Sequence, residues 1–219
     1  MKSFIKLFIT SLLLSSAFIS TSYASGCAGE YYQITVTNLT RSQIMSPFIV
    51  STHSKPFSLF TAGSEASPEL SALAQDADTS GLEALMSNAP GSREVAISGG
   101  PVLPGKTVTV EIPAHGGKYV SLASMLVTTN DAFTGLNGAR VRGKYNSYMS
   151  VAYDAGAENN DESCAYIPGP PCGNGGAASE EPGEGYVYVH QGIQGTGDLD
   201  SSFDWRNPVA KITIKRIRK

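Results

Sequence analysis

Oxygen-bearing side chains gather in three segments of this 219-residue chain, Thr128 to Asp131, Tyr153 to Glu162 and Gly197 to Asp200. Carboxylates that lie within a few ångströms raise one another's pKa unless a cation neutralises them. Calcium suits such a group, because it accepts about six to eight oxygen ligands from flexible loops. The spacing between Asp154 and Glu158 lacks the regular alternation of an EF-hand loop, so a calcium site here must be assembled from separate loops. The competing interpretation is a set of solvated acidic loops.

The three histidines do not indicate a zinc site. None of His53, His115 and His190 has a Cys or another His at the spacing of zinc ligands. His115 lies in a Gly-rich turn and is expected to be solvated, whereas His190 follows a predicted strand and is expected to hydrogen-bond a neighbouring loop. The chain also lacks a Gly-x-Ser-x-Gly elbow, a His-Glu-x-x-His helix and a phosphate-binding glycine loop. These absences disfavour the common hydrolases.

The first 24 residues have the features of a signal peptide. Lys2 and Lys6 flank the start of an apolar run from Leu7 to Ile19, and Ser22 and Ala24 supply small residues before a cleavage point. We therefore expect export, cleavage after Ala24, and a secreted or periplasmic domain over residues 25–219. No other stretch approaches the roughly 20 apolar residues of a membrane helix, so no membrane span is expected.

The cysteines agree with an oxidising compartment. Cys164 and Cys172 flank a segment rich in proline and glycine, which predicts a local disulfide between them. Cys27 is then left over. Small residues precede it, as they do in a lipidated N-terminal cysteine, but a free or intermolecularly paired thiol is the interpretation we favour.

Composition indicates one domain with many turns. Hydrophobic residues make up 41% of the chain, enough for a sizeable core, and 23 Gly and 12 Pro argue against long helices. The formal net charge of -3 gives no global field for nucleic acid, so no nucleic-acid partner is expected. Five of the 16 Lys and Arg residues fall in the last nine positions, which leaves the rest of the chain distinctly acidic.

Short strands separated by turn residues dominate the pattern. They are expected over Tyr32 to Leu39, Phe48 to Val50, Val95 to Ile97, Val108 to Ile112, Tyr119 to Val127, Ser147 to Tyr153, Tyr186 to His190 and Val209 to Ile217. Two short helices interrupt them, one capped by Ser67 with Pro68 at its first position and one starting near Thr79 or Ser80. This order predicts an all-β, antiparallel sandwich with a short helical insertion. Residues 154–185 form an unusually long loop, which is typical of a functional or disordered segment.

Several segments together resemble the spondin-type domain of F-spondin, mindin and their bacterial relatives. They are Thr129 to Leu136, Tyr153 to Glu158, His190 to Ile193, Gly197 to Leu199 and, most specifically, the Asp-Trp-Arg-Asn-Pro-Val-Ala block from Asp204 to Ala210. The resemblance implies a C2-like β-sandwich outside the cell that binds matrix or cell-surface partners and holds calcium in loops at one end.

The family's calcium carboxylates map to Asp131, Asp154 and Glu158. Two positions depart from the family pattern: Ala132 interrupts an aromatic pair and leaves Phe133 alone, and Glu158 replaces the usual Asp. A carboxylate is nevertheless present at every mapped position, so these three residues are the predicted calcium ligands.

The closing block has a structural interpretation. We expect Trp205 and Phe203 to seal one end of the core, and Asn207-Pro208 to bring the chain extended into the last strand. Arg206 is placed to pair with an acidic loop.

Two functions from different classes fit these observations. The favoured one is an exported, monomeric, non-enzymatic adhesion module that binds an envelope or extracellular protein or glycan. The alternative is an envelope-polymer hydrolase that uses Asp154 and Glu158 as acid catalysts. Catalytic carboxylates must flank a cleft about 5 to 9.5 Å wide, with one held protonated by an apolar pocket. A metal among Asp131, Asp154 and Glu158 favours binding, whereas an open cleft between them favours catalysis.

Overall fold

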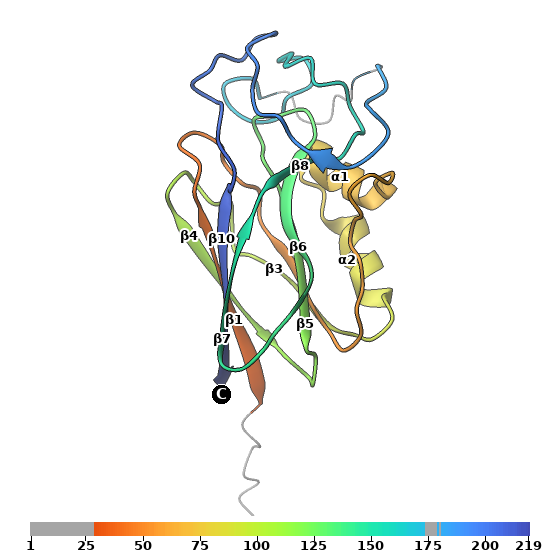
Figure 1. The fold of residues 1–219 in the computed structure, drawn as a ribbon, viewed down its shortest axis with the longest axis vertical. Helices are drawn as coiled ribbons and strands as arrows, with labels where there is room; N and C mark the ends of the chain where they lie inside the picture. The colour runs from red at the N-terminus through yellow and green to blue at the C-terminus, as the bar shows by residue number, and fades with distance from the viewer. Residues whose placement is uncertain (1–28, 174–178, 180) are drawn as a thin grey trace, which may run out of the picture.

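The computed structural model describes residues 29–173, 179 and 181–219. Two antiparallel β-sheets pack face to face, and two helices cover the outer side of the larger one (Figure 1). The four-stranded sheet has the order β4 (Thr107–Pro113), β1 (Glu30–Asn38), β10 (Ala210–Arg218) and β7 (Tyr145–Ser150). The six-stranded sheet has the order β3 (Ser92–Ile97), β2 (Ile49–His53), β5 (Tyr119–Met125), β6 (Ala132–Arg140), β8 (Ala152–Asp154) and β9 (Tyr188–Val189). The predicted all-β sandwich is confirmed.

The core between the sheets follows the alternation along β1. Tyr32, Ile34 and Val36 are buried, while the residues between them face outward. Ile34 and Val36 lie opposite Ile214 and Ile212 of β10, so the two central strands of the smaller sheet place their apolar side chains on one face. Burial of that face is the main stabilising contribution of this sheet.

The helical insertion consists of α1 (Pro68–Asp76) and α2 (Ser80–Asn88). As predicted, the Ser67 side chain caps α1 by accepting a hydrogen bond from Leu70 N, and Pro68 occupies the first turn. The helices form a second core against the outer face of the larger sheet, made by Leu70, Leu73, Leu82, Met86, Ile49, Ala123 and Phe133. Strand β2 is consequently buried along its whole length.

Strand β6 is not predicted by the sequence pattern. The pattern ends the preceding strand at Val127 and marks no further strand before Ser147, because Gly135, Asn137 and Gly138 break the apolar alternation. The structure explains Gly135: a Cβ at this position would overlap the carbonyl oxygen of Leu122 on the neighbouring strand. Close approach of two backbones therefore requires glycine here.

One predicted strand is two strands in different sheets. The stretch Ser147 to Tyr153 divides at Val151, so that β7 pairs with β10 and β8 pairs with β6. The predicted strand Tyr186 to His190 shortens to β9, which pairs with β8 at the edge of the larger sheet. Because the chain crosses between the sheets, β8 lies beside β6, and its last residue is Asp154.

The closing block seals the core as predicted. Trp205 is buried in the cluster between the sheets, and Phe203 packs against that cluster. The Asn207-Pro208 peptide is cis, and Asn207 Oδ1 accepts a hydrogen bond from Ala152 N at 2.8 Å. Arg206 pairs with Asp204, two residues away, and its side chain is otherwise exposed.

The acidic segments lie together at one end of the sandwich, opposite the C-terminus (Figure 1). Among the described residues, no helix is long and apolar enough to cross a membrane. The predicted signal peptide and Cys27 fall outside the described residues.

Candidate metal centre

The three predicted ligands lie close together because β6 and β8 are neighbours. Asp131 immediately precedes β6, Asp154 ends β8, and Ala132 lies opposite Asp154 in the ladder. Glu158 follows Asp154 by four residues, in the loop that folds back over Asp131. The exposed fractions of the three residues are 0%, 0% and 1%, respectively. They are therefore not a solvated acidic face.

Asp131 ties the loop after β8 to the start of β6. Its Oδ2 accepts hydrogen bonds from Ala157 N at 2.7 Å and Glu158 N at 3.1 Å, and its carbonyl oxygen accepts from Ala155 N at 3.2 Å. Its Oδ1 is buried and has no hydrogen-bond partner. One oxygen of this carboxylate is thus hydrogen-bonded to the loop, and the other has no hydrogen-bond partner.

Asp154 is held by its own loop. Its Oδ1 accepts a hydrogen bond from Gly156 N and its Oδ2 accepts one from Asn160 Nδ2, each at 2.7 Å. Gly156 has φ 67°, and a Cβ there would overlap the backbone of Tyr186, so only glycine fits this turn. Each carboxylate oxygen has two lone pairs, which leaves Asp154 with acceptor capacity.

Glu158 connects the centre to the helical insertion. Its Oε1 accepts hydrogen bonds from Gln75 Nε2 of α1 and from Ser179 N, each at 3.1 Å. Its Oε2, like Asp131 Oδ1, is buried without a hydrogen-bond partner. Gln75 lies 83 positions away in sequence, and no sequence pattern marks it as part of this site.

A neutral histidine network closes one side of Asp154. His190 Nδ1 accepts a hydrogen bond from Gly192 N at 3.0 Å, so in the neutral ring Nε2 carries the proton and donates to Asn160 Oδ1 at 3.1 Å. The same Nε2 lies 3.6 Å from Asp154 Oδ2, and the Trp205 ring packs against the imidazole. The expected contact of His190 with a neighbouring loop is confirmed. Burial lowers the pKa of His190 to about 4, so the ring carries no charge near neutral pH.

The carboxylates lack a compensating positive charge. Burial, followed by the nearby charge of Asp154, raises the pKa of Asp131 to about 8. Burial also raises the pKa of Asp154 to about 6, and it raises the pKa of Glu158 above its ordinary value. In the part of the chain that the structure describes, no Lys or Arg forms an ion pair with any of the three. Each therefore ionises reluctantly unless a cation is supplied.

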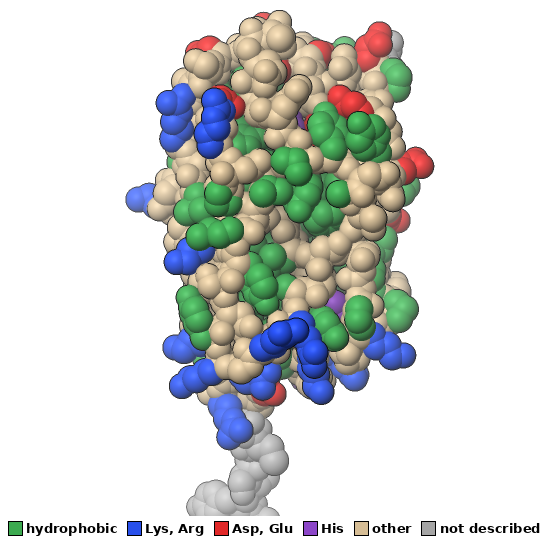
Figure 2. Space-filling model, in the orientation of Figure 1, with side chains coloured by type: hydrophobic (Ala, Val, Ile, Leu, Met, Phe, Trp, Pro, Cys, Tyr) green, Lys and Arg blue, Asp and Glu red, His purple; other side chains and the backbone are tan. Residues whose placement is uncertain are grey.

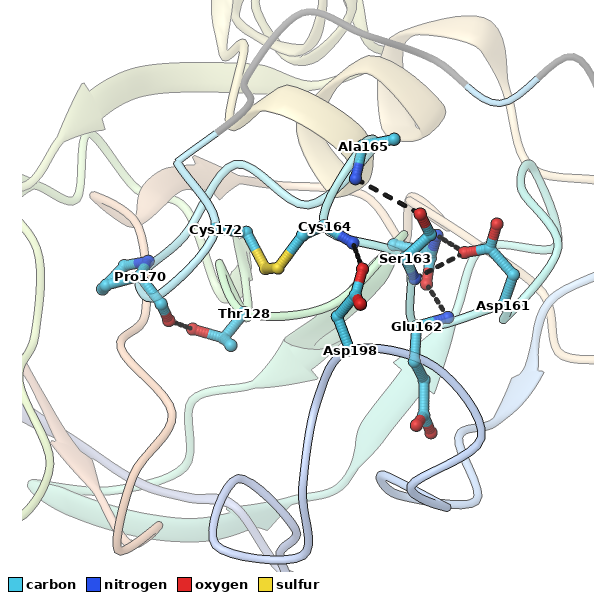
Figure 3. Close-up of a disulfide and its surroundings, with 10 residues drawn as sticks. Thr128, Asp161, Glu162, Ser163, Cys164, Ala165, Pro170, Cys172 and Asp198 are labelled. Atoms are coloured by element: carbon cyan, nitrogen blue, oxygen red, sulfur yellow. Dashed lines mark hydrogen bonds between the residues drawn. A yellow bond between two sulfur atoms is a disulfide. The ribbon is translucent and has the colours of Figure 1, made fainter.

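Other acidic residues of these loops serve as structural braces (Figure 3). Asp198 Oδ2 accepts a hydrogen bond from Cys164 N at 2.9 Å, and Asp161 Oδ1 accepts from Ser163 N at 2.9 Å. The buried carboxylate of Glu162 accepts from the backbone N–H groups of Gln194 and Thr196. These groups satisfy backbone donors in a region without regular secondary structure.

The predicted disulfide between Cys164 and Cys172 is confirmed, with Cα atoms 4.8 Å apart (Figure 3). Next to it, the Thr128 hydroxyl donates to Pro170 O at 2.9 Å, which ties the bridged loop to the segment that leads to Asp131. The bridge and this hydrogen bond stabilise the loops beside the three carboxylates.

The oxygen donors of the centre suit a hard cation, but their arrangement is not that of a complete coordination shell. Within the described ranges, no three His, Cys, Asp or Glu side chains stand in an arrangement that could hold a metal ion. Two of the buried oxygens without a hydrogen-bond partner, Asp131 Oδ1 and Glu158 Oε2, nevertheless belong to predicted ligands. Oxygen donors of this kind suit calcium or magnesium rather than zinc or copper.

Comparison with protein-family models and comparison with curated proteins each find no match to this chain. The relation to the spondin-type domain stays a prediction from the sequence segments that resemble it.

Proposed function

We propose that this chain is an exported, non-enzymatic binding module of the spondin type, which holds calcium among Asp131, Asp154 and Glu158. The observation that carries the proposal is the pair of buried, unpartnered oxygens, Asp131 Oδ1 and Glu158 Oε2, in a carboxylate cluster without a countercharge. Burial of such groups is costly unless they are paired or coordinate a metal. A cation bound between them removes that cost.

Calcium fits better than magnesium because the ligands come from elements of different rigidity. Asp131 and Asp154 flank paired strands, whereas Glu158 lies on a loop. Calcium tolerates irregular shells and takes carbonyl and water oxygens as well as carboxylates, while magnesium requires a near-ideal octahedron.

The bound ion would order the loop end of the sandwich. It would connect the start of β6, the end of β8 and the loop after β8, and through Gln75 it would also fix α1. A surface made of loops binds a partner better when its loops are preorganised. We therefore assign calcium a structural role in adhesion to an envelope or extracellular protein or glycan.

Burial favours binding over hydrolysis. Asp154 and Glu158 are closed to solvent, and their hydrogen bonds are to residues of their own loops and of α1. A glycosidase must place two carboxylates on either side of an accessible bond. A polymer has no access to these two.

A groove at the same end offers a contact surface for a partner. Its volume is about 520 Å³, and Arg41, Asp204, Trp205 and Arg206 are among its lining residues. The exposed Arg206 also borders a second hollow, lined by His190 and residues 191–194. Arginine next to an aromatic residue is common at contact surfaces.

Thermal unfolding with chelator and with calcium tests the proposal. A ligand that binds only the folded state stabilises it by about 2.7 kcal/mol at a hundredfold excess over Kd. Loop sites of extracellular modules bind calcium with Kd of about 0.1 to 1 mM, so the rise in Tm should appear by a few millimolar. Magnesium should give a smaller rise. An unchanged Tm across the calcium series would remove the metal from the proposal, and a pull-down with and without calcium would test the binding role.

A further inference from the structure

Lys and Arg are concentrated at one end of the sandwich, although Figure 2 also shows some of them near the loop end. Lys and Arg gather at the end where the C-terminal strand finishes, and Asp and Glu gather mostly at the loop end. We call the first region the basic end; it comprises Lys118, Arg140, Arg142, Lys144, Lys215, Arg216, Arg218 and Lys219. The three predicted calcium ligands belong to the opposite end.

The basic residues come from three parts of the chain that lie side by side. Val141 N donates to Lys118 O at 2.8 Å, which joins the turn before β5 to the turn after β6. Arg216 N donates to Lys144 O at 2.9 Å, which joins that second turn to β10. A groove of about 480 Å³ at this end is lined by Lys144, residues 215–217 and Arg218. The basic end is therefore one continuous surface.

Acidic neighbours neutralise only a small part of this surface. Arg216 forms an ion pair with Glu30, with Nε and Oε1 2.6 Å apart, and Lys219 forms an ion pair with Glu111. The other six residues of the basic end form no ion pair within the described residues, and all six are exposed. An exposed surface with several unpaired charges of one sign attracts an anionic partner. A flat, extended partner satisfies several of them at once.

The point where the N-terminal segment joins the fold is relevant to the kind of anionic surface. Lys219 N donates to Gly29 O, and Glu30 lies opposite Arg218, so residues 1–28 join the fold at the basic end. Those residues include the apolar run from Leu7 to Ile19 and Cys27. A retained apolar segment or a lipid on Cys27 would bring a bilayer against this end. Cleavage would instead leave a positively charged amino group there.

An aromatic side chain completes the surface. Tyr145 is 59% exposed between Lys144 and its ladder partner Lys215. Tyrosine next to basic residues is typical of the membrane–water interface. We propose that the basic end docks on the anionic phospholipid headgroups of a bilayer, so that the loop end points away from the membrane. This inference does not depend on calcium at the other end.

Vesicle co-sedimentation tests the docking. The chain as purified from the producing cell is mixed, in chelator, with vesicles of phosphatidylcholine alone or with roughly 30% phosphatidylglycerol. We expect at least a hundredfold tighter binding to the anionic vesicles and loss of that preference between about 0.05 and 0.3 M salt. Because the lipid and salt comparisons use the wild-type chain, they need no variant.

Two charge-matched double variants locate the surface. Arg142→Gln/Lys144→Gln removes two charges of the basic end and should weaken binding by roughly 25-fold, from about fivefold per charge. Lys106→Gln/Lys211→Gln removes two exposed charges elsewhere and should leave the binding close to that of wild type.

Three results would overturn the proposal. The first is equal binding to the neutral and the anionic vesicles. The second is equal loss of binding in the two double variants when both melt at the wild-type temperature. The third is capture by a soluble sulfated polysaccharide without binding to anionic vesicles, which would assign the surface to a glycan instead. A missing calcium effect on Tm leaves all of these measurements unaffected, so failure of the metal proposal and failure of the docking proposal are separate outcomes.

Discussion

Replacement of Asp131 by Asn should raise stability in chelator and abolish the stabilisation by calcium. Burial raises the pKa of Asp131 from 3.8 to about 8, so the folded chain resists the ionisation that the unfolded chain undergoes freely. The stabilising contribution of this group is fully present below pH 3.8 and is lost as the pH rises toward about 8. Without metal, wild-type protein at pH 8 therefore carries an ionisation penalty.

The magnitude follows from the pKa values and the hydrogen bonds. A rise from 3.8 to about 8 corresponds to a penalty on the order of 5 kcal/mol at pH 8. The side-chain amide of the variant keeps an oxygen for Ala157 N and Glu158 N but places an NH₂ group where the unpartnered Oδ1 lies, which costs about 1 to 3 kcal/mol. In chelator at pH 8, Asp131→Asn should thus be about 2 to 4 kcal/mol more stable than wild type. For a chain of this length the gain corresponds to about 4 to 16 °C in Tm.

Scanning calorimetry at two pH values checks each part of this expectation. At pH 5 most of the penalty is gone, so wild type and variant should melt close together in chelator. In a few millimolar calcium at pH 8, wild type should gain stability and Asp131→Asn should not. Asp198→Asn is the matched control, because Asp198 is an exposed loop aspartate that accepts one backbone hydrogen bond. It should respond to calcium as wild type does.

One pattern would refute this reasoning. If Asp131→Asn melts below wild type in chelator at pH 8 and still rises with calcium as wild type does, Asp131 is not an uncompensated carboxylate and not a ligand. The buried oxygens would then need another explanation.

Asp154→Asn should weaken the calcium response more than Glu158→Gln, because Asp154 ends a paired strand while Glu158 lies on a loop. Calcium titrations monitored by the fluorescence of Trp205, the single tryptophan, compare the two variants. Calcium affinity should rise as the pH increases from 6 to 8, since the ion must displace the proton that Asp131 holds with a pKa of about 8. Calorimetric titration in buffers of different ionisation enthalpy should detect that released proton, and an affinity that stays constant over this range would contradict the assignment. Loss of the Cys164–Cys172 bridge through Cys172→Ser should lower stability by about 2 to 3 kcal/mol, measured by urea unfolding, because the closed loop is short. A midpoint equal to that of wild type would mean that the prolines already hold the loop closed.

Much of the sandwich could be predicted from local patterns. The alternation of Tyr32, Ile34 and Val36 identifies β1, and Ser67 followed by Pro68 marks the start of α1. The disulfide followed from the turn-forming residues between the two cysteines. These features depend on residues within one element or one turn, so side-chain period and capping chemistry are sufficient to predict them.

The elements missed from the sequence depend on pairing across the fold. In β6, glycines break the alternation, and the need for Gly135 is explained only by the neighbouring strand that approaches it. The crossing at Val151 divides one extended stretch between two sheets. A period of two residues is the same on both sides of that crossing, so it cannot show that the partner strand changes.

For the candidate centre, the sequence by itself determined which carboxylates are present and that they fall in loops near strand ends. Only the tertiary structure decided that Asp131, Asp154 and Glu158 are buried, that Gln75 of the helical insertion contacts Glu158, and that two oxygens lack partners. The physical reason is that desolvation and unmet hydrogen bonds depend on everything packed around a group, and that packing brings together residues far apart in the chain. A carboxylate in a loop has the same sequence signature whether it faces water or is closed beneath a second loop and a helix.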